Sequence, residues 1–414
     1  MADKAIQIAF NGETVSQDFY ADVVLVKVEE NSRMANTMEL RLATRMDESG
    51  AWVYLEDDRF APFTSVSVRI GFTGGGGLAG ALGAAASALG GGPGSGDDGL
   101  ERVFDGYITS VDLKLGSNPA DGHLAISAMD TSVLMSLEEK IVTWKNLSDS
   151  DIVQQIVTGV YQIPLQADAT STVRQENDTT VVQRASDIQF VRDRSELNGM
   201  EFYFETDKAS GTVNAYFQAP QLDGTPQPDL AIQFGDQSNL RSFSARLNGQ
   251  RPLTVKTQQL DVKSNSANNG QAADTQFTKL GARDANDLVG GPLASLVTPK
   301  EAQAQMLVLG TPTSDAGELQ TIAQAVRDEA AWFITAEGEI NSDAYGNVLR
   351  PHRLALVKGA GKPFSGKYYI TRVVHELKGD GTYTQRFEAR RNARDVDGSE
   401  QFGGGGSGLP IPGI

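Results

Sequence analysis

Two stretches of the chain share one pattern of hydrophobic and polar positions. In residues 104–111, Phe-Asp-Gly is followed by Tyr-Ile-Thr-Ser-Val, and an alternating run covers 123–129. In residues 364–373, Phe-Ser-Gly leads through Lys-Tyr into Tyr-Ile-Thr-Arg-Val, and a Gly-Asp-Gly turn then precedes the run 383–389. Each copy follows an apolar segment that ends at a glycine. Because a period of two is typical of half-buried strands and glycine turns join hairpins, we predict that one β unit is used twice.

The last run of the second copy separates into two faces. Tyr383, Phe387 and Ala389 share one face, and the other is polar: Thr384, Arg386, Glu388 and Arg390. We therefore expect residues 107–111 and 369–373 to be core strands. The outward arginines are candidate contacts with another protein chain, and the alternative is a solvated polar face. These candidate interface residues are Arg372, Arg386 and Arg390.

Alternation predicts further strands along the chain. They fall at 6–10, 20–28, 38–42, 66–72, 200–204, 213–217, 230–234, 240–247 and 253–262. A Gly-, Ala- and Ser-rich excursion, 73–99, interrupts the first copy and is expected to be flexible, although part of it could form a short helix. It is not a phosphate-binding loop, because no Gly-Lys-Ser/Thr follows and its flanks are strands. Residues 264–299, rich in Asn, Ala, Asp and Gly, are expected to form a loop.

Three helices are predicted from capping residues and from apolar residues at helical spacing. Ser148 is a suitable N-cap for a helix that buries its apolar residues up to Val160. A second helix begins at Ser186-Asp187 and ends at Gly199. A third, residues 315–335, begins with what resembles a capping box and buries an apolar stripe that includes Phe333.

Length and composition limit the class of protein. A chain of 414 residues exceeds the roughly 250–300 at which a single core stops growing, so we expect several domains. The absence of cysteine excludes disulfides and thiol or Cys-ligated metal sites. A net charge of −17 argues against a surface that grips nucleic acid, and fits either plain solubility or an acidic channel wall past which polyanions travel. Neither a secretory signal nor an apolar run long enough to cross a bilayer is visible.

Candidate chemistry is sparse. The three histidines, His123, His352 and His375, show no metal-ligand spacing and are expected to be structural. A faint calcium-loop pattern at 341–346 lacks the closing glutamate and is expected to be a turn. Three acidic residues could in principle pair as glycosidase carboxylates, but nothing isolates a pair among Glu329, Glu337 and Glu339. We therefore expect no catalytic residue, no cofactor and no metal site.

Two segments resemble a known family. Residues 185–203 contain Ala-Ser-Asp-Ile-Gln-Phe-Val-Arg, then Gly-Met-Glu-Phe-Tyr, which is similar to a segment of phage late-control protein D and of the N-terminal hub part of VgrG spikes. The run from Gly361 to Asn392 resembles the closing domain of the same family. VgrG chains continue into an OB domain and a needle, whereas here Gly- and Pro-rich residues follow, so the resemblance favours a hub with a separate spike protein.

The resemblance implies a mainly β fold with an α+β insert, assembled as a trimeric, pseudo-sixfold ring. The expected parts are a β-barrel tube domain at 1–144, a small α+β domain at 145–211, a second barrel at 212–394 and a tail at 395–414. Implied partners are two further copies, the tail tube protein, a trimeric spike protein, other baseplate proteins and a tape measure protein. Sequence-specific nucleic-acid binding and stable membrane insertion are not expected.

The implied function is that of a baseplate hub at the virion tail or in a released particle, assembled in the bacterial cytoplasm. It would adapt the sixfold tube to the threefold spike and line a channel for DNA or effectors. Three alternatives stay open: the hub of an extracellular contractile injection system, a wall-degrading tail enzyme, and a receptor-binding adhesin.

Overall fold

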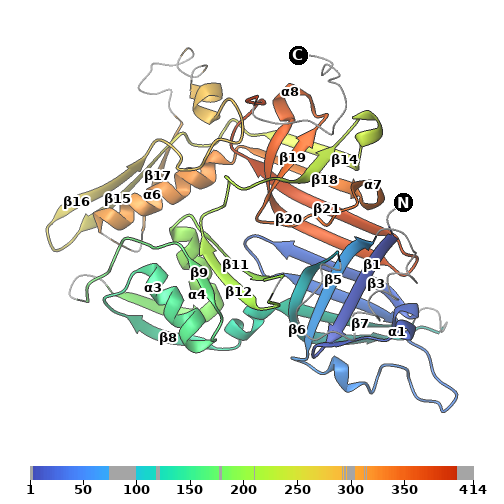
Figure 1. Ribbon diagram of the computed structural model, residues 1–414. Coiled ribbons are helices and arrows are strands. Elements are labelled where there is room, and N and C mark those ends of the chain that lie inside the picture. Colours follow the sequence, from blue (N-terminus) through green and yellow to red (C-terminus); the bar gives the residue numbers. More distant parts are fainter. Residues whose placement is uncertain are drawn as a thin grey trace.

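The computed structural model describes residues 3–73, 99–117, 122–176, 180–208, 210–290, 292, 295, 304–311, 313 and 315–398. Within these residues the chain is mainly β, as predicted, with one 13-stranded sheet and smaller sheets of three, three and two strands (Figure 1). The Gly- and Ala-rich residues 74–98 and the tail residues 399–414 lie outside the described residues.

The large sheet contains two six-stranded units. The first consists of β1 (Asp3–Phe10), β3 (Val23–Asn31), β4 (Thr37–Ala43), β5 (Ser65–Thr73), β6 (Leu100–Lys114) and β7 (His123–Asp130). The second consists of β13 (Gln227–Ala231), β14 (Leu240–Leu247), β18 (Ile334–Asn341), β19 (Leu354–Lys358), β20 (Gly366–Lys378) and β21 (Tyr383–Arg391). A short strand, β2 (Glu13–Thr14), extends the first unit beyond β1.

Both units place their strands in the same order. The first reads β3-β4-β7-β6-β5-β1 and the second reads β14-β18-β21-β20-β19-β13. Numbered along the chain within each unit, both orders are 2-3-6-5-4-1. The first strand differs, because β1 pairs with β5 antiparallel whereas β13 pairs with β19 parallel. The doubling predicted from the sequence is thus present as a repeated topology.

The Tyr-Ile-Thr signature occupies the same place in both units. The ladder of β6 with β7 shifts register at Thr109, and the ladder of β20 with β21 shifts at Thr371. At each bulge the threonine hydroxyl donates a hydrogen bond of 3.2 Å across the ladder, to the carbonyl of Ser127 in the first unit and of Glu388 in the second. A bulge is a specific local feature, so its recurrence at one position strengthens the equivalence.

The Phe-x-Gly motif is not equivalent in the two units, contrary to expectation. Gly106 lies inside β6, where an added Cβ would lie 2.1 Å from the Met129 carbonyl oxygen. Gly366 instead begins β20 after the short helix α8 (Gly361–Phe364), with φ of 129°. Gly106 lies one residue before the tyrosine of Tyr-Ile-Thr, whereas Gly366 lies three residues before it. Each glycine is required at its own position, but the two positions are not equivalent.

The strand β20 joins the two units. Its first half pairs with β19, and its second half pairs antiparallel with β3, from Arg372 opposite Asn31 to Lys378 opposite Leu25. Leu377 and Tyr383 consequently lie in the core of the first unit, where the Tyr383 ring is 6.0 Å from that of Phe72. Eight strands, β14-β18-β21-β20-β3-β4-β7-β6, form one continuous surface across both units.

A separate α+β part has its own core. It contains the ribbon β8 (Glu139–Trp144) and β10 (Val181–Ser186), and the sheet β9 (Leu165–Ala167), β11 (Glu201–Thr206) and β12 (Val213–Gln218). Helix α3 (Asp149–Gln154) continues as a π-helical segment, Gln155–Val160, and α4 spans Asp187–Leu197. The Ser148 cap is confirmed as a capping box with Asp151. Val160 is exposed, contrary to the predicted stripe, because the π turn rotates it off the buried face.

Residues 264–299 are not only a loop. Strand β16 (Ser266–Ala272) pairs with β15 (Thr254–Asp261), which also pairs with β17 (Gln305–Val308). Helix α6 (Ala316–Ala331) covers this sheet (Figure 1). A Cβ on Gly270 would lie 2.5 Å from the Leu319 backbone, so glycine lets the helix approach closely. Residues 266–272 have the composition of a loop but form a strand because they pair with β15.

Two predicted boundaries are also wrong. The predicted strand 20–28 begins only at Val23, because Tyr20 belongs to the short helix α1 (Gln17–Ala21). The predicted helix 315–335 ends at Ala331, and Phe333 is buried in the second unit's core next to the start of β18. In both places an adjacent strand's pairing ends the helix.

Candidate interaction surfaces and buried junctions

The eight-stranded surface presents one polar face, opposite the two cores. Ladder registers place eight basic residues on it: Lys27, Arg41, Lys114, Arg246, Arg372, Lys378, Arg386 and Arg390. They place seven acidic residues there as well: Glu29, Glu39, Asp112, Glu337, Glu339, Glu376 and Glu388. This polar face is therefore nearly neutral, although the whole chain carries −17.

The three predicted interface arginines lie on this polar face and are all paired within the chain. Arg372 contacts Glu29 at 2.7 Å and Glu388 at 2.6 Å, and the hydrogen bond to Glu29 raises the pKa of the guanidinium. Arg386 is the most exposed of the three and lies 3.3 Å from Glu376. Arg372 and Arg386 line one hollow on this polar face, together with Glu337, Glu339 and Glu388.

Arg390 lies apart from that hollow. It pairs at 3.0 Å with Glu329 of α6, which also pairs at 2.5 Å with Arg33. Glu329 and Glu339 are thus each held by arginines, Glu339 by Arg241 at 3.2 Å.

A buried polar cluster lies where the two units join. Glu30 accepts hydrogen bonds from Arg350 at 2.7 Å and contacts His375 Nε2 at 3.0 Å, while His375 Nδ1 lies 2.8 Å from the Tyr383 hydroxyl. Burial opposes ionisation of Glu30, but the charge of Arg350 and the contact with His375 outweigh it and lower the pKa of the carboxyl. Burial raises the pKa of Tyr383 well above its ordinary value.

A second buried cluster joins the α+β part to the second unit. Glu201 of β11 contacts His352 Nδ1 at 3.1 Å and accepts a hydrogen bond of 2.6 Å from the Tyr369 hydroxyl. Burial opposes ionisation, yet the contact with His352 lowers the pKa of Glu201. His352 has φ of 60° and its ring stacks on Tyr203 at 3.5 Å between centroids. His352 and His375 thus have structural partners.

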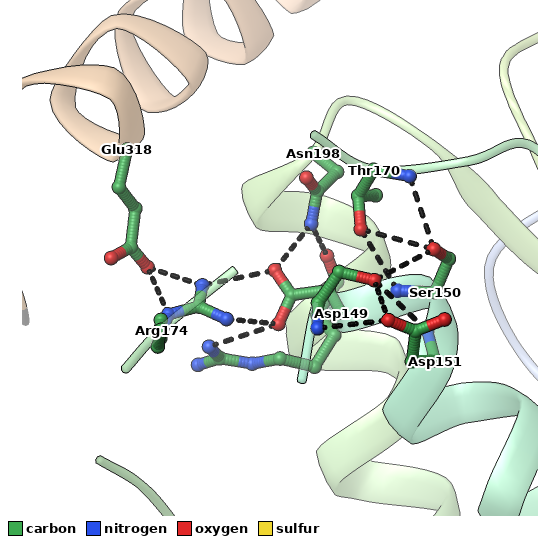
Figure 2. A network of polar contacts seen from close by, with 9 residues as sticks. Asp149, Ser150, Asp151, Thr170, Arg174, Asn198 and Glu318 are labelled. Atoms are coloured by element: carbon green, nitrogen blue, oxygen red, sulfur yellow. Dashed lines mark hydrogen bonds and ion pairs between the residues drawn. The ribbon is translucent and has the colours of Figure 1, made fainter. Parts of the chain in front are cut away.

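A third buried cluster ties the α+β part to α6 (Figure 2). Arg174 lies between Asp149, at 2.8 Å, and Glu318, at 2.5 Å. Burial disfavours the charged guanidinium, but the hydrogen bond to Glu318 and the contacts with Asp149 raise the pKa of Arg174. Asn198 donates a further hydrogen bond of 2.8 Å to Asp149. The predicted capping box of Asp315 and Glu318 is therefore only half formed, because the Glu318 side chain binds Arg174.

Sequence reasoning missed these clusters. Glu30 and His375 are 345 positions apart, and Arg174 and Glu318 are 144 apart. No local spacing indicates such pairs.

The described part of the chain holds no group of three or more His, Asp or Glu residues able to bind a metal ion. Residues 341–346 form the single-turn helix α7 (Ser342–Tyr345), closed by Gly346 with φ of 62°. Among the residues the structure describes, no helix is both long and apolar enough to span a membrane.

The fold is that of phage tail proteins and related secretion components. The 43 kDa tail protein of prophage MuSo2 from Shewanella oneidensis is 12% identical with a TM-score of 0.59, over 95% of this chain and 100% of that one. A tail protein from Neisseria meningitidis MC58 is 11% identical with a TM-score of 0.61, over 94% and 97%. The E. coli c3393 protein, a component of the type VI secretion system, is 13% identical with a TM-score of 0.50, over 89% and 73%.

The sequence itself identifies the family. Residues 95–379, more than half of the chain, match the family described as the Alg8 N-terminal domain, and the chain belongs to this family. No curated protein sequence matches the chain. At identities of 11–13% the structural likenesses establish the fold alone.

Proposed function

We propose that this chain is the structural hub of a contractile tail-like particle and works as a homotrimer. It joins a sixfold tail tube to a threefold spike protein and lines the channel through which DNA or effectors pass. The observation that carries the proposal is the repeated strand order of the two units. Three chains then offer six equivalent β units to a sixfold tube and keep threefold features for the spike, which resolves the symmetry mismatch.

The polar face is the proposed wall of the channel. Three copies of the eight-stranded surface would give a wall of 24 strands. Its charges alternate in sign and many are paired, as in Arg372 with Glu29 and Glu388. A polyanion therefore meets no dense basic patch that would hold it by counterion release. The net charge of the sequence suggested an acidic channel wall, whereas the proposed wall is nearly neutral. Either kind of wall would let a polyanion pass without binding.

The setting is either a phage tail or an injection system. Tail proteins of prophage and a type VI secretion component share the fold, so the proposal covers both. Neighbouring genes for capsid and terminase would indicate a phage. The role is mechanical in either case, and peptidoglycan zymography of the purified protein should show no clearing.

Mass in solution tests the proposal. Light scattering of the purified protein should give three times the chain mass of 44.2 kDa. Electron microscopy of particles carrying a tagged chain should place the tag at the tail base. A strict monomer that is also absent from the tail base would contradict the hub.

A further inference from the structure

The edge strands of the two units are covered to different extents. In the first unit, β20 covers β3, and Val26 and Val28 are fully buried. In the second unit the edge strand is β14, which among the described strands pairs only with β18. Among the described strands, β3 therefore has a neighbour on its outer edge, whereas β14 has none.

The ladders align β14 with β3 residue by residue. Val28 lies opposite Met38, and Ala245 lies opposite Ala336, at equivalent places in the two units. Both edge strands also shift register at the same point, after Val23 in one and after Leu240 in the other. Phe243, Ala245 and Leu247 therefore take the places of Val26, Val28 and Glu30.

The inward side of β14 is uncovered as a result. Val26, Val28 and Glu30 are no more than 2% exposed, whereas Leu247 is 36% exposed and Phe243 and Ala245 are only partly buried. An apolar strand side that is buried in one unit and open in its equivalent indicates a missing neighbour.

Among the described strands of the first unit, the second half of β6 has one open edge that fits this gap. β5 leaves β6 at Tyr107, and beyond the Thr109 bulge β6 pairs only with β7 among the described strands. The equivalents of buried Val373, His375 and Leu377 are Val111, Leu113 and Leu115. These three are 38%, 40% and 47% exposed. A row of apolar side chains on an open strand edge is a liability unless another chain covers it.

We propose that residues 110–115 of one copy pair with β14 of a second copy, just as residues 372–377 pair with β3 within the chain. The inference rests on the proposed assembly and specifies its contact. Transferring the register of β20 and β3 gives five pairs across the interface: Val111 with Leu247, Asp112 with Arg246, Leu113 with Ala245, Lys114 with Ser244, and Leu115 with Phe243.

The residues brought together are complementary. The apolar side of one strand meets the apolar side of the other, and the Asp112 carboxylate lies opposite the Arg246 guanidinium. Bonds from Ser32 N–H to the Thr371 carbonyl and from Gly379 N–H to the Val24 carbonyl show which pairs of the internal ladder exchange hydrogen bonds. By that alternation Asp112 and Arg246 form a non-hydrogen-bonded pair, where side chains are closest. The contact is heterologous, so repeating it closes a ring or extends a filament.

Engineered disulfides test the register, and the cysteine-free sequence provides a clean background. The matched variant is Lys114→Cys with Ser244→Cys, a non-hydrogen-bonded pair with Cα atoms about 4.5 Å apart. The control, Lys114→Cys with Ser242→Cys, is two positions out of register, at about 7–8 Å or more, beyond the reach of a disulfide. Mild oxidation should cross-link the matched variant roughly ten times more than the control, with covalent products that end at three chains.

The outcomes separate the two proposals. A trimeric wild type whose matched pair stays reduced, or cross-links no better than the control, overturns the pairing and leaves the hub standing. A wild type that stays monomeric and is absent from particles overturns both. Cross-linked products that continue beyond three chains would show the pairing but contradict the closed trimer.

Charge exchange at the same interface gives a second measurement. Asp112→Arg or Arg246→Asp alone should weaken assembly about tenfold by placing like charges opposite each other. The double variant should recover to within about twofold, because the opposite charges meet again. Single variants that assemble like the wild type would contradict the proposed register.

Discussion

The equivalent edge strands β3 and β14 differ in the side chains that they present to a neighbouring strand. Within the chain, β3 presents Glu30 to β20, and the buried carboxylate is held by Arg350 and His375. At the equivalent place on the open strand β14 stands Leu247. A buried charge network is costly when only half formed. The contact of β20 with β3 forms during folding of one chain, so both halves of the charge network are always present. On β14, which is exposed until a second copy binds, an apolar side chain avoids leaving a charge without its partner.

The largest expected effect comes from breaking the internal joint. Glu30→Gln removes the charge that balances buried Arg350 and should cost about 3–5 kcal/mol of unfolding free energy. Glu29→Gln, on the polar face of the same strand, should cost no more than about 1 kcal/mol. Denaturant unfolding of both variants measures the difference. Equal losses would mean that the joint does not depend on its buried cluster.

Equivalent leucines should respond unequally. Leu377→Ala opens a cavity in the first unit's core and should cost about 2–5 kcal/mol. Leu115→Ala, at the equivalent exposed position, should change the stability of the dissociated chain by less than about 0.5 kcal/mol. It should instead raise the concentration needed for assembly, which sedimentation at several concentrations would show. A comparable loss of fold stability at Leu115 would mean that its side chain is already covered within one chain.

Acid should loosen both carboxylate junctions. The pKa values of Glu30 and Glu201 are lowered in the folded chain from the ordinary 4.5. The unfolded chain therefore binds protons first as pH falls, so this stability is fully present above about pH 4.5 and is lost as pH drops through the folded pKa values. Unfolding followed from pH 7 downward should steepen below 4.5, and Glu30→Gln should flatten that slope. An unchanged slope would show that Glu30 is not ionised in the fold.

The smallest expected effect tests the shared bulge. Thr371→Val removes a largely buried hydrogen bond to the Glu388 carbonyl and should cost about 1 kcal/mol. Thr109→Val removes the matching bond at an exposed site, where water replaces it, and should cost about 0.5 kcal/mol or less. Thermal unfolding of the two variants provides the comparison. A larger loss at Thr109 would contradict the assignment of its strand as an open edge.

The sequence predicted the elements whose burial is periodic. Alternation located most strands of both units, and Ser148 and Gly199 correctly marked helix ends. The repeat of Tyr-Ile-Thr predicted the repeat of topology. Strand β16 was missed because its Asn-, Gly- and Ala-rich residues become a strand only by pairing with β15 and lying under α6.

Two valines of the repeated motif show that the local sequence does not determine whether a side chain is covered. Val111 and Val373 occupy the same position of the same signature, yet one is 38% exposed and the other fully buried. The sequence alone determined that each lies on the apolar side of a strand, because periodicity records which side faces a core. Only the tertiary structure decided that β3 covers one of them, since pairing partners more than 300 residues apart leave no trace in local spacing.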